Sequence, residues 1–301
     1  MMPSPTSPVR DAASIERLSR TFASGLSIVD LARPLISLDD NQTAAAGLDL
    51  LHRSGETVLG LRSDGLIVAW ATAEDLASGG LLVDHSRPFD SHLMLNDAAG
   101  IREVLVAIGN APHIFVRWLG IVTGVVTKVD LQKPPVRMWL FGLVTLLDTN
   151  LTWALETVYP GEAWTGLISK GRLEKAIALR DERRRRGSDC RLVDCLQIKD
   201  KADALTRDAA RFQQLGWMSR RETERLAGDI EVLRNHLAHA QELEDAHLAT
   251  AARLAALLEA ILRADIASRL VATVELSSPS PNPLPPSSNP SAPASSSSLE
   301  S

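Results

Sequence analysis

The stretch GIVTGVVTKVDL at residues 120–131 decides the fold of the first part of this chain. Valine and isoleucine favour extended backbone, so these residues predict a strand over 121–126. Thr127 follows, three positions before Asp130. A threonine caps a helix by accepting from free backbone N–H groups, and an acid suits the first helical turn. We therefore expect a strand that leads directly into a capped helical turn.

The same pattern occurs 55 positions earlier, without a gap. A repeat of this length indicates two copies of one supersecondary unit. The matched pairs are Asn41 and Asn96, Ala44 and Ala99, Leu50 and Leu105, Gly65 and Gly120, Thr72 and Thr127, and Asp75 and Asp130.

Each copy predicts a helix, two strands and a short helix. Asn41 and Asn96 can cap the first helix of each copy, which runs to about Arg53 or Gly109. Strands are expected at 57–62 and 66–71, and again at 113–118 and 121–126, because these runs are rich in valine, isoleucine and leucine. Gly65 and Gly120 lie in the turns between them, which favours two hairpins.

This order of elements, together with residues 120–131, resembles the CBS domain, named after cystathionine β-synthase. The resemblance implies that the two copies pack as one pseudo-symmetric module. It also implies a regulatory ligand, an adenine nucleotide (AMP, ADP or ATP) or another adenosyl compound.

In that family a Gly-x-x-Thr-x-x-Asp motif commonly holds the ribose hydroxyls, and Gly124, Thr127 and Asp130 match it. The first copy keeps Thr72 and Asp75 but has Ala69 at the place of the glycine. An alternative stays open: each threonine and aspartate serves only to cap a helix.

Pro134-Pro135 marks the boundary to a second, helical part. Apolar residues at helical spacing predict helices over 136–158, 169–186, 189–215 and 245–270, and another begins at the capping box Ser219–Glu222. We expect an α+β chain, in which a tandem module of β-α-β-β-α repeats precedes an all-α bundle of four or five helices.

The helix after Ser219 contains Arg234, Asn235 and His239. A guanidinium, an amide and an imidazole can bind a phosphodiester and move a proton at neutral pH. The Arg-x4-His spacing resembles the motif of the HEPN superfamily of helical domains, many of which are metal-independent ribonucleases. The resemblance implies attack by the RNA 2′-hydroxyl, with His239 as acid or base and Arg234 on the phosphate. It also implies a composite cleft in a homodimer, and chemistry without a metal or another cofactor.

Two interpretations of the whole chain follow. In the first, an adenine-nucleotide-sensing module controls a HEPN-like RNA endonuclease. In the second, the chain is a non-enzymatic, ligand-responsive oligomerisation or interaction protein, and Arg234 and His239 are structural. Whether the chain is an enzyme stays open between them.

Composition bounds both interpretations. The formal net charge of −5 gives no global attraction for nucleic acid, so RNA contact needs a local basic patch. The apolar run 138–147 is shorter than a bilayer span, so we expect no membrane partner. Two cysteines imply no disulfide framework, and a cytoplasmic location is expected.

The expected domain organisation has four parts: an N-terminal extension (1–20), the tandem CBS-like module (21–133), the HEPN-like bundle (135–272) and a disordered Ser/Pro tail (277–301).

Overall fold

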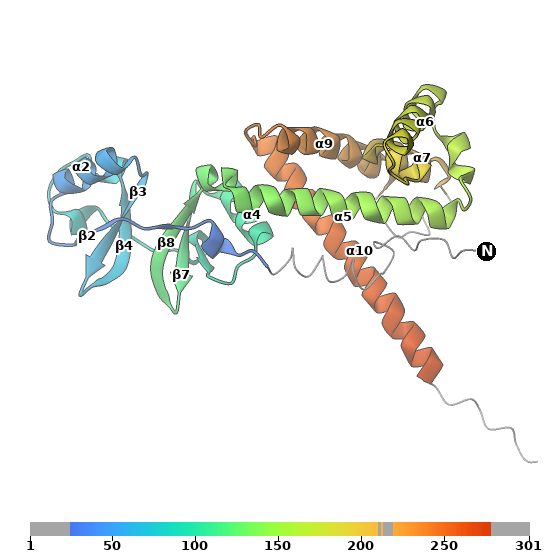
Figure 1. The fold of residues 1–301 in the computed structure, drawn as a ribbon. Coiled ribbons are helices and arrows are strands. Elements are labelled where there is room, and N and C mark those ends of the chain that lie inside the picture. The colour runs from blue at the N-terminus through green and yellow to red at the C-terminus, as the bar shows by residue number, and fades with distance from the viewer. Residues whose placement is uncertain (1–24, 210–211, 213–218, 278–301) are drawn as a thin grey trace, which may run out of the picture. The chain divides into compact units, whose positions relative to one another are not determined.

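The computed structural model describes residues 25–209, 212 and 219–277, with side chains as far as Ile261. The chain is α+β, with strands in its first part and helices in the remainder (Figure 1). Met1–Ile261 and Leu262–Ser301 are two separate units. The expected extension at 1–20 lies outside the described residues. So does the expected tail, except Ser277, which ends the last helix.

The first repeat forms the elements that its sequence predicts. They are β2 (Ser37–Asp39), α2 (Ala44–Ser54), β3 (Val58–Ser63), β4 (Leu66–Thr72) and α3 (Ala73–Leu76). Strand β2 runs parallel to β3, and β3 pairs antiparallel with β4.

The second repeat has the same order and the same pairing. Its elements are β6 (Met94–Asn96), α4 (Ile101–Asn110), β7 (His113–Trp118), β8 (Ile121–Thr127) and the 3-10 turn η4 (Lys128–Gln132). The expected hairpins are confirmed in both repeats. The helix expected at Thr127 is a 3-10 turn, and Lys133 ends it with extended backbone just before Pro134.

The helices of the two repeats correspond at an offset of 57, which corrects the single offset of 55. Helix α2 begins at Ala44 and α4 at Ile101, and both residues are fully or almost fully buried. The offset returns to 55 at β3 and β7, because α4 and the turn after it are each one residue shorter than in the first repeat.

This shift overturns the two expected asparagine caps. Thr43 caps α2 through a hydrogen bond that its side chain accepts from the Ala46 N–H, and Gly100 precedes α4. Asn96 ends β6 instead, where its side chain accepts from Arg117 Nε at 3.0 Å.

Each sheet has one additional short strand. In the sequence, that strand lies just before the repeat that forms the other sheet. Strand β1 (Arg33–Pro34) comes before the first repeat but pairs antiparallel with β8 of the second. Strand β5 (Arg87–Pro88) comes before the second repeat but pairs with β4 of the first. The strand orders are therefore β1-β8-β7-β6 and β2-β3-β4-β5.

After Lys133 the described elements are all helices or 3-10 turns. They are α5 (Pro134–Val158), η5 (Ala163–Leu167), α6 (Lys170–Arg185), η6 (Leu192–Cys195), α7 (Ile198–Arg207), α9 (Arg220–Ala238) and α10 (Asp245–Ser277). Buried residues of α5, α7, α9 and the first part of α10 share one hydrophobic core. That core also includes α4, so it continues from the second repeat into the helical part.

The helix expected over 189–215 is wrong at its start. Asp194 accepts from the Arg191 N–H, and Asp200 accepts from the Gln197 N–H, so two caps interrupt the backbone where one helix was expected. Positions 210–211 and 213–215 of the expected helix lie outside the described residues.

Helix α5 is long and apolar enough, by length and composition, to cross a membrane, and no other helix among the described residues is. Over its most apolar window 56% of the residues are buried inside the protein, as in a core helix. The buried Lys201 ammonium donates to Asp148 and Thr152 on α5, at 2.7 Å and 2.9 Å.

Candidate functional site

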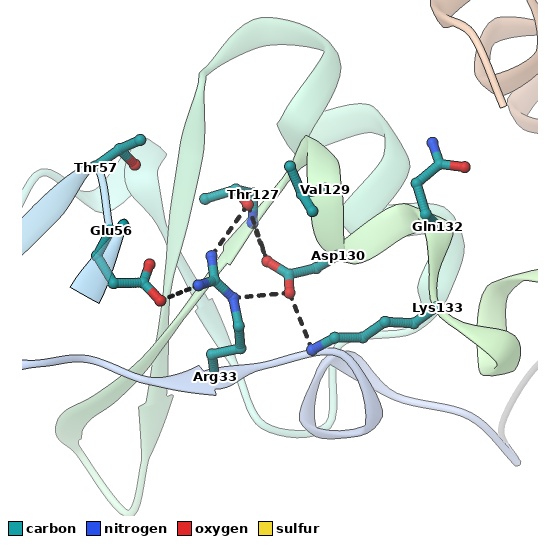
Figure 2. Close-up of a pocket in the computed structure, with 9 residues that line it drawn as sticks. Arg33, Glu56, Thr57, Thr127, Val129, Asp130, Gln132 and Lys133 are labelled. Carbon is teal, nitrogen blue, oxygen red and sulfur yellow. Dashed lines mark hydrogen bonds and ion pairs between the residues drawn. The ribbon is translucent and has the colours of Figure 1, made fainter. Parts of the chain in front are cut away.

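A cavity of about 400 Å³ lies where the two repeats meet (Figure 2). The turn between α2 and β3 supplies one wall, β1 supplies Arg33, and the segment from Thr127 into Lys133 supplies the other wall. The lining residues are Arg33, Gly55, Glu56, Thr57, Thr127, Val129, Asp130, Gln132 and Lys133.

Among the residues that line this cavity, Asp130 is the least exposed, at 1%. Its Oδ2 accepts from the backbone N–H and the hydroxyl of Thr127, at 2.8 Å and 3.0 Å. Its Oδ1 accepts from Arg33 Nε and Lys133 Nζ, both at 2.9 Å. A carboxylate offers about four acceptor positions, so all of them are occupied.

Burial alone would raise the pKa of Asp130. The hydrogen bonds from Lys133, Thr127 and Arg33 together outweigh burial, so the pKa lies below its ordinary value. Asp130 is therefore a buried anion at neutral pH.

Arg33 joins the two walls of the cavity. Besides Asp130 it donates to Glu56, and its Nη2 donates to Thr127 Oγ1 at 3.3 Å. Sequence reasoning missed Arg33, Glu56 and Lys133. One signal was available for Arg33, because the dipeptide Arg-Pro occurs at 33–34 and again at 87–88.

Gly124 lies beside this site, on β8 opposite Pro34. A Cβ at Gly124 would lie 3.0 Å from the backbone oxygen of Arg33 and 3.4 Å from Ala32 Cβ. The absence of a side chain at Gly124 therefore lets the edge strand β1 lie close against β8. Ala69 is the equivalent residue of the first repeat and faces Pro88.

The first repeat has a similar arrangement around Asp75. The backbone N–H and the hydroxyl of Thr72 donate to Asp75 Oδ2, both at 2.9 Å, and Arg87 Nε donates to Oδ1 at 3.0 Å. Burial would raise the pKa of Asp75, but the bonds from Arg87 and Thr72 lower it overall. The guanidinium of Arg87 also lies 5.3 Å from the centre of the Trp70 ring. The structure thus brings the predicted ligand residues together in two separate sites.

Arg234, Asn235 and His239 are exposed at the C-terminal end of α9. Arg234 Nη1 donates to Asn235 Oδ1 at 3.2 Å, and His239 is the residue that ends the helix. Glu231, three residues before Arg234, accepts from the Lys199 N–H at 3.4 Å. Exposure leaves the three side chains accessible to a substrate or a partner.

A second histidine of this segment, His236, faces inward against His247, with the ring centres 4.0 Å apart. Burial and then the neighbouring His236 lower the pKa of His247, and Glu244 opposes them in part. Among the described residues no group of three or more histidine, cysteine or acidic side chains is placed to hold a metal ion.

The run Arg183–Arg186 is engaged with its own surroundings. Arg183 and Arg184 donate to the backbone oxygens of Asp194 and Cys190. Arg185 and Arg186 pair with Glu182. These contacts account for the basic run without a nucleic acid.

No family model matches this chain, and no curated protein matches it. Solved structures to which it is similar include CBSX2 of Arabidopsis thaliana in complex with AMP, at 19% identity and a TM-score of 0.33, covering 39% of this chain and 98% of that one. Another is the CBS domain of the bacterial CNNM/CorC family Mg²⁺ transporter in complex with ATP, at 14% identity and a TM-score of 0.33, covering 41% and 96%. A third is a hemolysin-like CBS-domain protein of Oenococcus oeni, at 14% identity and a TM-score of 0.31, covering 39% and 94%. At these identities and TM-scores the likeness assigns neither a family nor a ligand to this chain.

Proposed function

We propose that the paired repeats are a sensor of adenine nucleotides and regulate the helical part of the chain. The observation that carries the proposal is the cavity at Asp130. It places a buried carboxylate, a threonine and two cationic side chains, Arg33 and Lys133, around a space of about 400 Å³. Clefts of this size accept small organic ligands.

The chemistry of these groups fits a ribose that carries phosphate. Asp130 can accept two hydrogen bonds from a vicinal diol, as the family resemblance implies. Because its four acceptor positions are occupied, the diol must displace two of the present donors, among them Arg33 or Lys133. A displaced cation needs a new anion, and a nucleotide phosphate supplies one. We therefore expect ATP and AMP to bind more tightly than adenosine.

Thermal unfolding of the full chain with ATP, AMP or adenosine tests this function. A ligand that binds only the folded state raises the melting temperature, and the added stability grows as RT ln(1 + [L]/Kd). Asp130→Ala should weaken the shift more than Asp75→Ala, because the described cavity lies at Asp130. If neither nucleotide shifts the parent, or if Asp130→Ala keeps the full shift, the proposed site is wrong.

RNA cleavage by the helical part is a second candidate function. The observation that favours it is the exposure of Arg234, Asn235 and His239 near one helix end. Arg234 and His239 lie about 140° apart around the helix, so a shared site needs a second chain. In this proposal two chains form a homodimer, His239 moves the proton and Arg234 holds the phosphate. The competing proposal is a bundle that binds partners without catalysis.

A further inference from the structure

Lys128 and Gln132 of η4, together with Arg137 at the start of α5, reach one turn of the helical part, residues 239–245. Lys128 Nζ donates to both carboxylate oxygens of Asp245, at 3.1 Å and 2.9 Å. Arg137 Nη2 donates to the backbone oxygen of Gln241 at 2.6 Å. The turn between α9 and α10 is therefore held at Gln241 and at Asp245.

Gln132 holds the middle of the turn through a reciprocal pair of hydrogen bonds. Its Nε2 donates to the Leu243 backbone oxygen and its Oε1 accepts from the Leu243 N–H, both at 2.9 Å. The Leu243 side chain is 3% exposed and belongs to the shared core. We call the contacts of Lys128, Gln132 and Arg137 with this turn the clamp.

The clamp and the cavity share one short element. Asp130 and Gln132 both belong to η4, and Lys133 follows it directly. Figure 2 shows the Gln132 amide directed away from Asp130, so a ligand on Asp130 leaves the amide free to hold Leu243. Gln132 is the last residue of η4, so a change in the position or stiffness of η4 reaches Leu243 through the Gln132 side chain.

The turn begins with a left-handed residue, Ala240, at φ +52°. Helix α9 itself holds this start, because the N–H groups of Ala240 and Gln241 donate to the backbone oxygens of Leu237 and His236. The clamp contact nearest to His239 is the bond from Arg137 to Gln241, two residues after the exposed imidazole.

We propose that the clamp transmits the occupancy of the Asp130 cavity to the α9–α10 turn and so to His239. This inference rests on the proposed nucleotide function and adds the route of regulation. A ligand that bridges Asp130 and Lys133 stiffens η4, the clamp tightens, and the turn opens less often. The coupling is an energetic link between two distinct places, mediated by named contacts.

Hydrogen exchange of the full chain, without ligand and with saturating ATP, measures both ends of the route. Segment 125–133 reports the cavity, and the amides of 239–245 report the turn. The Leu243 N–H is the most direct probe, because its acceptor is Gln132. We expect ATP to slow exchange at Leu243 by about threefold to tenfold, the effect of a modest gain in hydrogen bonding.

Two variants interrupt the clamp. The double change Lys128→Ala with Arg137→Ala leaves every side chain that lines the cavity in place. Gln132→Ala removes the central pair, and its ATP affinity is measured separately because Gln132 lines the cavity. Gln42→Ala is the matched control, since the exposed Gln42 amide donates to Asn41. ATP should still slow segment 125–133 in the double variant. Its slowing of 239–245 should be smaller there than in the parent, because the Gln132–Leu243 pair remains, and it should be lost at Leu243 in Gln132→Ala, while the control behaves as the parent.

The variant Asp130→Asn tests the coupling between η4 and the turn without a ligand. It removes the anion that holds Arg33 and Lys133, so η4 should loosen and Leu243 should exchange faster when the clamp is intact. When Asp130→Asn is added to Gln132→Ala, it should no longer change exchange at Leu243.

The outcomes separate the two proposals. If ATP changes neither segment but Asp130→Asn speeds the turn through the clamp, the nucleotide is wrong and the coupling stands. If ATP slows 125–133 but leaves the turn unchanged in the parent, the coupling is wrong. Equal slowing of the turn with and without the clamp residues also overturns it.

Discussion

The guanidinium of Arg33 donates to Asp130 at 2.9 Å, although 97 positions separate the two residues. Arg87 donates in the same way to Asp75, only 12 positions away. Arg33 lies on β1, which completes the sheet of the second repeat, and Arg87 lies on β5, which completes the sheet of the first. Each aspartate of the repeat is therefore held by an edge strand, and one of these two contacts spans nearly the whole module.

Replacing Arg33 should destabilise the protein clearly. Arg33→Ala leaves the buried Asp130 with Lys133 as its remaining cation, and we expect a loss of about 2 kcal/mol in the free energy of unfolding, below the cost of an entirely unpaired buried charge. Arg62→Ala is the control, since Arg62 pairs with Asp39 at the surface and should cost about 0.5 kcal/mol. Urea unfolding at neutral pH measures both, and equal losses would contradict the assigned role of Arg33.

Gly124 and Gly109 should respond to alanine in opposite directions. A methyl group at Gly124 meets the backbone of β1 at 3.0 Å, so Gly124→Ala should cost about 1–3 kcal/mol. A methyl group at Gly109, on α4, meets nothing within 4 Å, so Gly109→Ala should stabilise the helix by about 0.5 kcal/mol. Thermal or urea unfolding of the two variants decides the matter; a neutral Gly124→Ala would show that β1 has room to move.

Acid should weaken the module through His113. This imidazole is 6% exposed and packs against Trp70 and Phe115, with ring centres 4.7 Å and 5.1 Å away. Burial and then the charge of Arg87 lower the pKa of His113 in the folded chain. The unfolded chain titrates near pH 6.5 and so binds the proton first, which means that stability is complete above about pH 6.5 and falls as the pH drops toward the folded pKa.

The variant His113→Phe removes this titration while it keeps a ring in the aromatic cluster. The loss of unfolding free energy between about pH 7 and pH 5 should therefore be smaller in His113→Phe than in the parent. Urea midpoints at several pH values provide the comparison. An identical slope in both proteins would assign the acid sensitivity to other groups.

RNA cleavage, if the second candidate function is right, should depend on His239 and Arg234 together. His239→Ala and Arg234→Ala should each reduce cleavage of a mixed RNA by at least about 100-fold, because imidazole supplies proton transfer and the guanidinium holds phosphate. Arg234→Lys should also be poor, and cleavage should persist in EDTA. In a homodimer with composite sites, mixing the two alanine variants should restore part of the activity.

Arg87 and His92 provide the matched control, because they have the same spacing. His92 is exposed and lies outside the helical part, so His92→Ala should cut RNA as the parent does. Parent-like cleavage by His239→Ala, or no cleavage by the parent, would leave the non-enzymatic interpretation.

Local signals explain what the sequence predicted correctly. The hairpins follow from β-branched strands around Ser63–Gly65 and Leu119-Gly120, and the structure has left-handed backbone at both glycines. The capping box at Ser219 likewise predicts the start of α9. Each of these features depends on neighbours a few residues away.

What the sequence did not predict depends on contacts between distant segments. Strand β1 has two residues, and its only signal is the Arg-Pro dipeptide shared with 87–88, which does not name β8 or Asp130 as its partner. The asparagine caps failed for a related reason. A sequence match without gaps hid the change of offset between the helices and the hairpins, since Asn96 serves a strand end and not a helix start.

The pairing of β1 with β8 also constrains how the chain folds. Arg33 is synthesised long before its partner Val125, so the sheet of the second repeat cannot close until both repeats have left the ribosome. Such long-range pairing slows folding, because a large loop must close before the strands gain anything from their contact. We therefore expect the paired repeats to fold as a single cooperative unit. A cut just after β5 leaves β5 with the sheet of the first repeat but removes β1 from the sheet of the second, so the second half is not expected to survive as an independent domain.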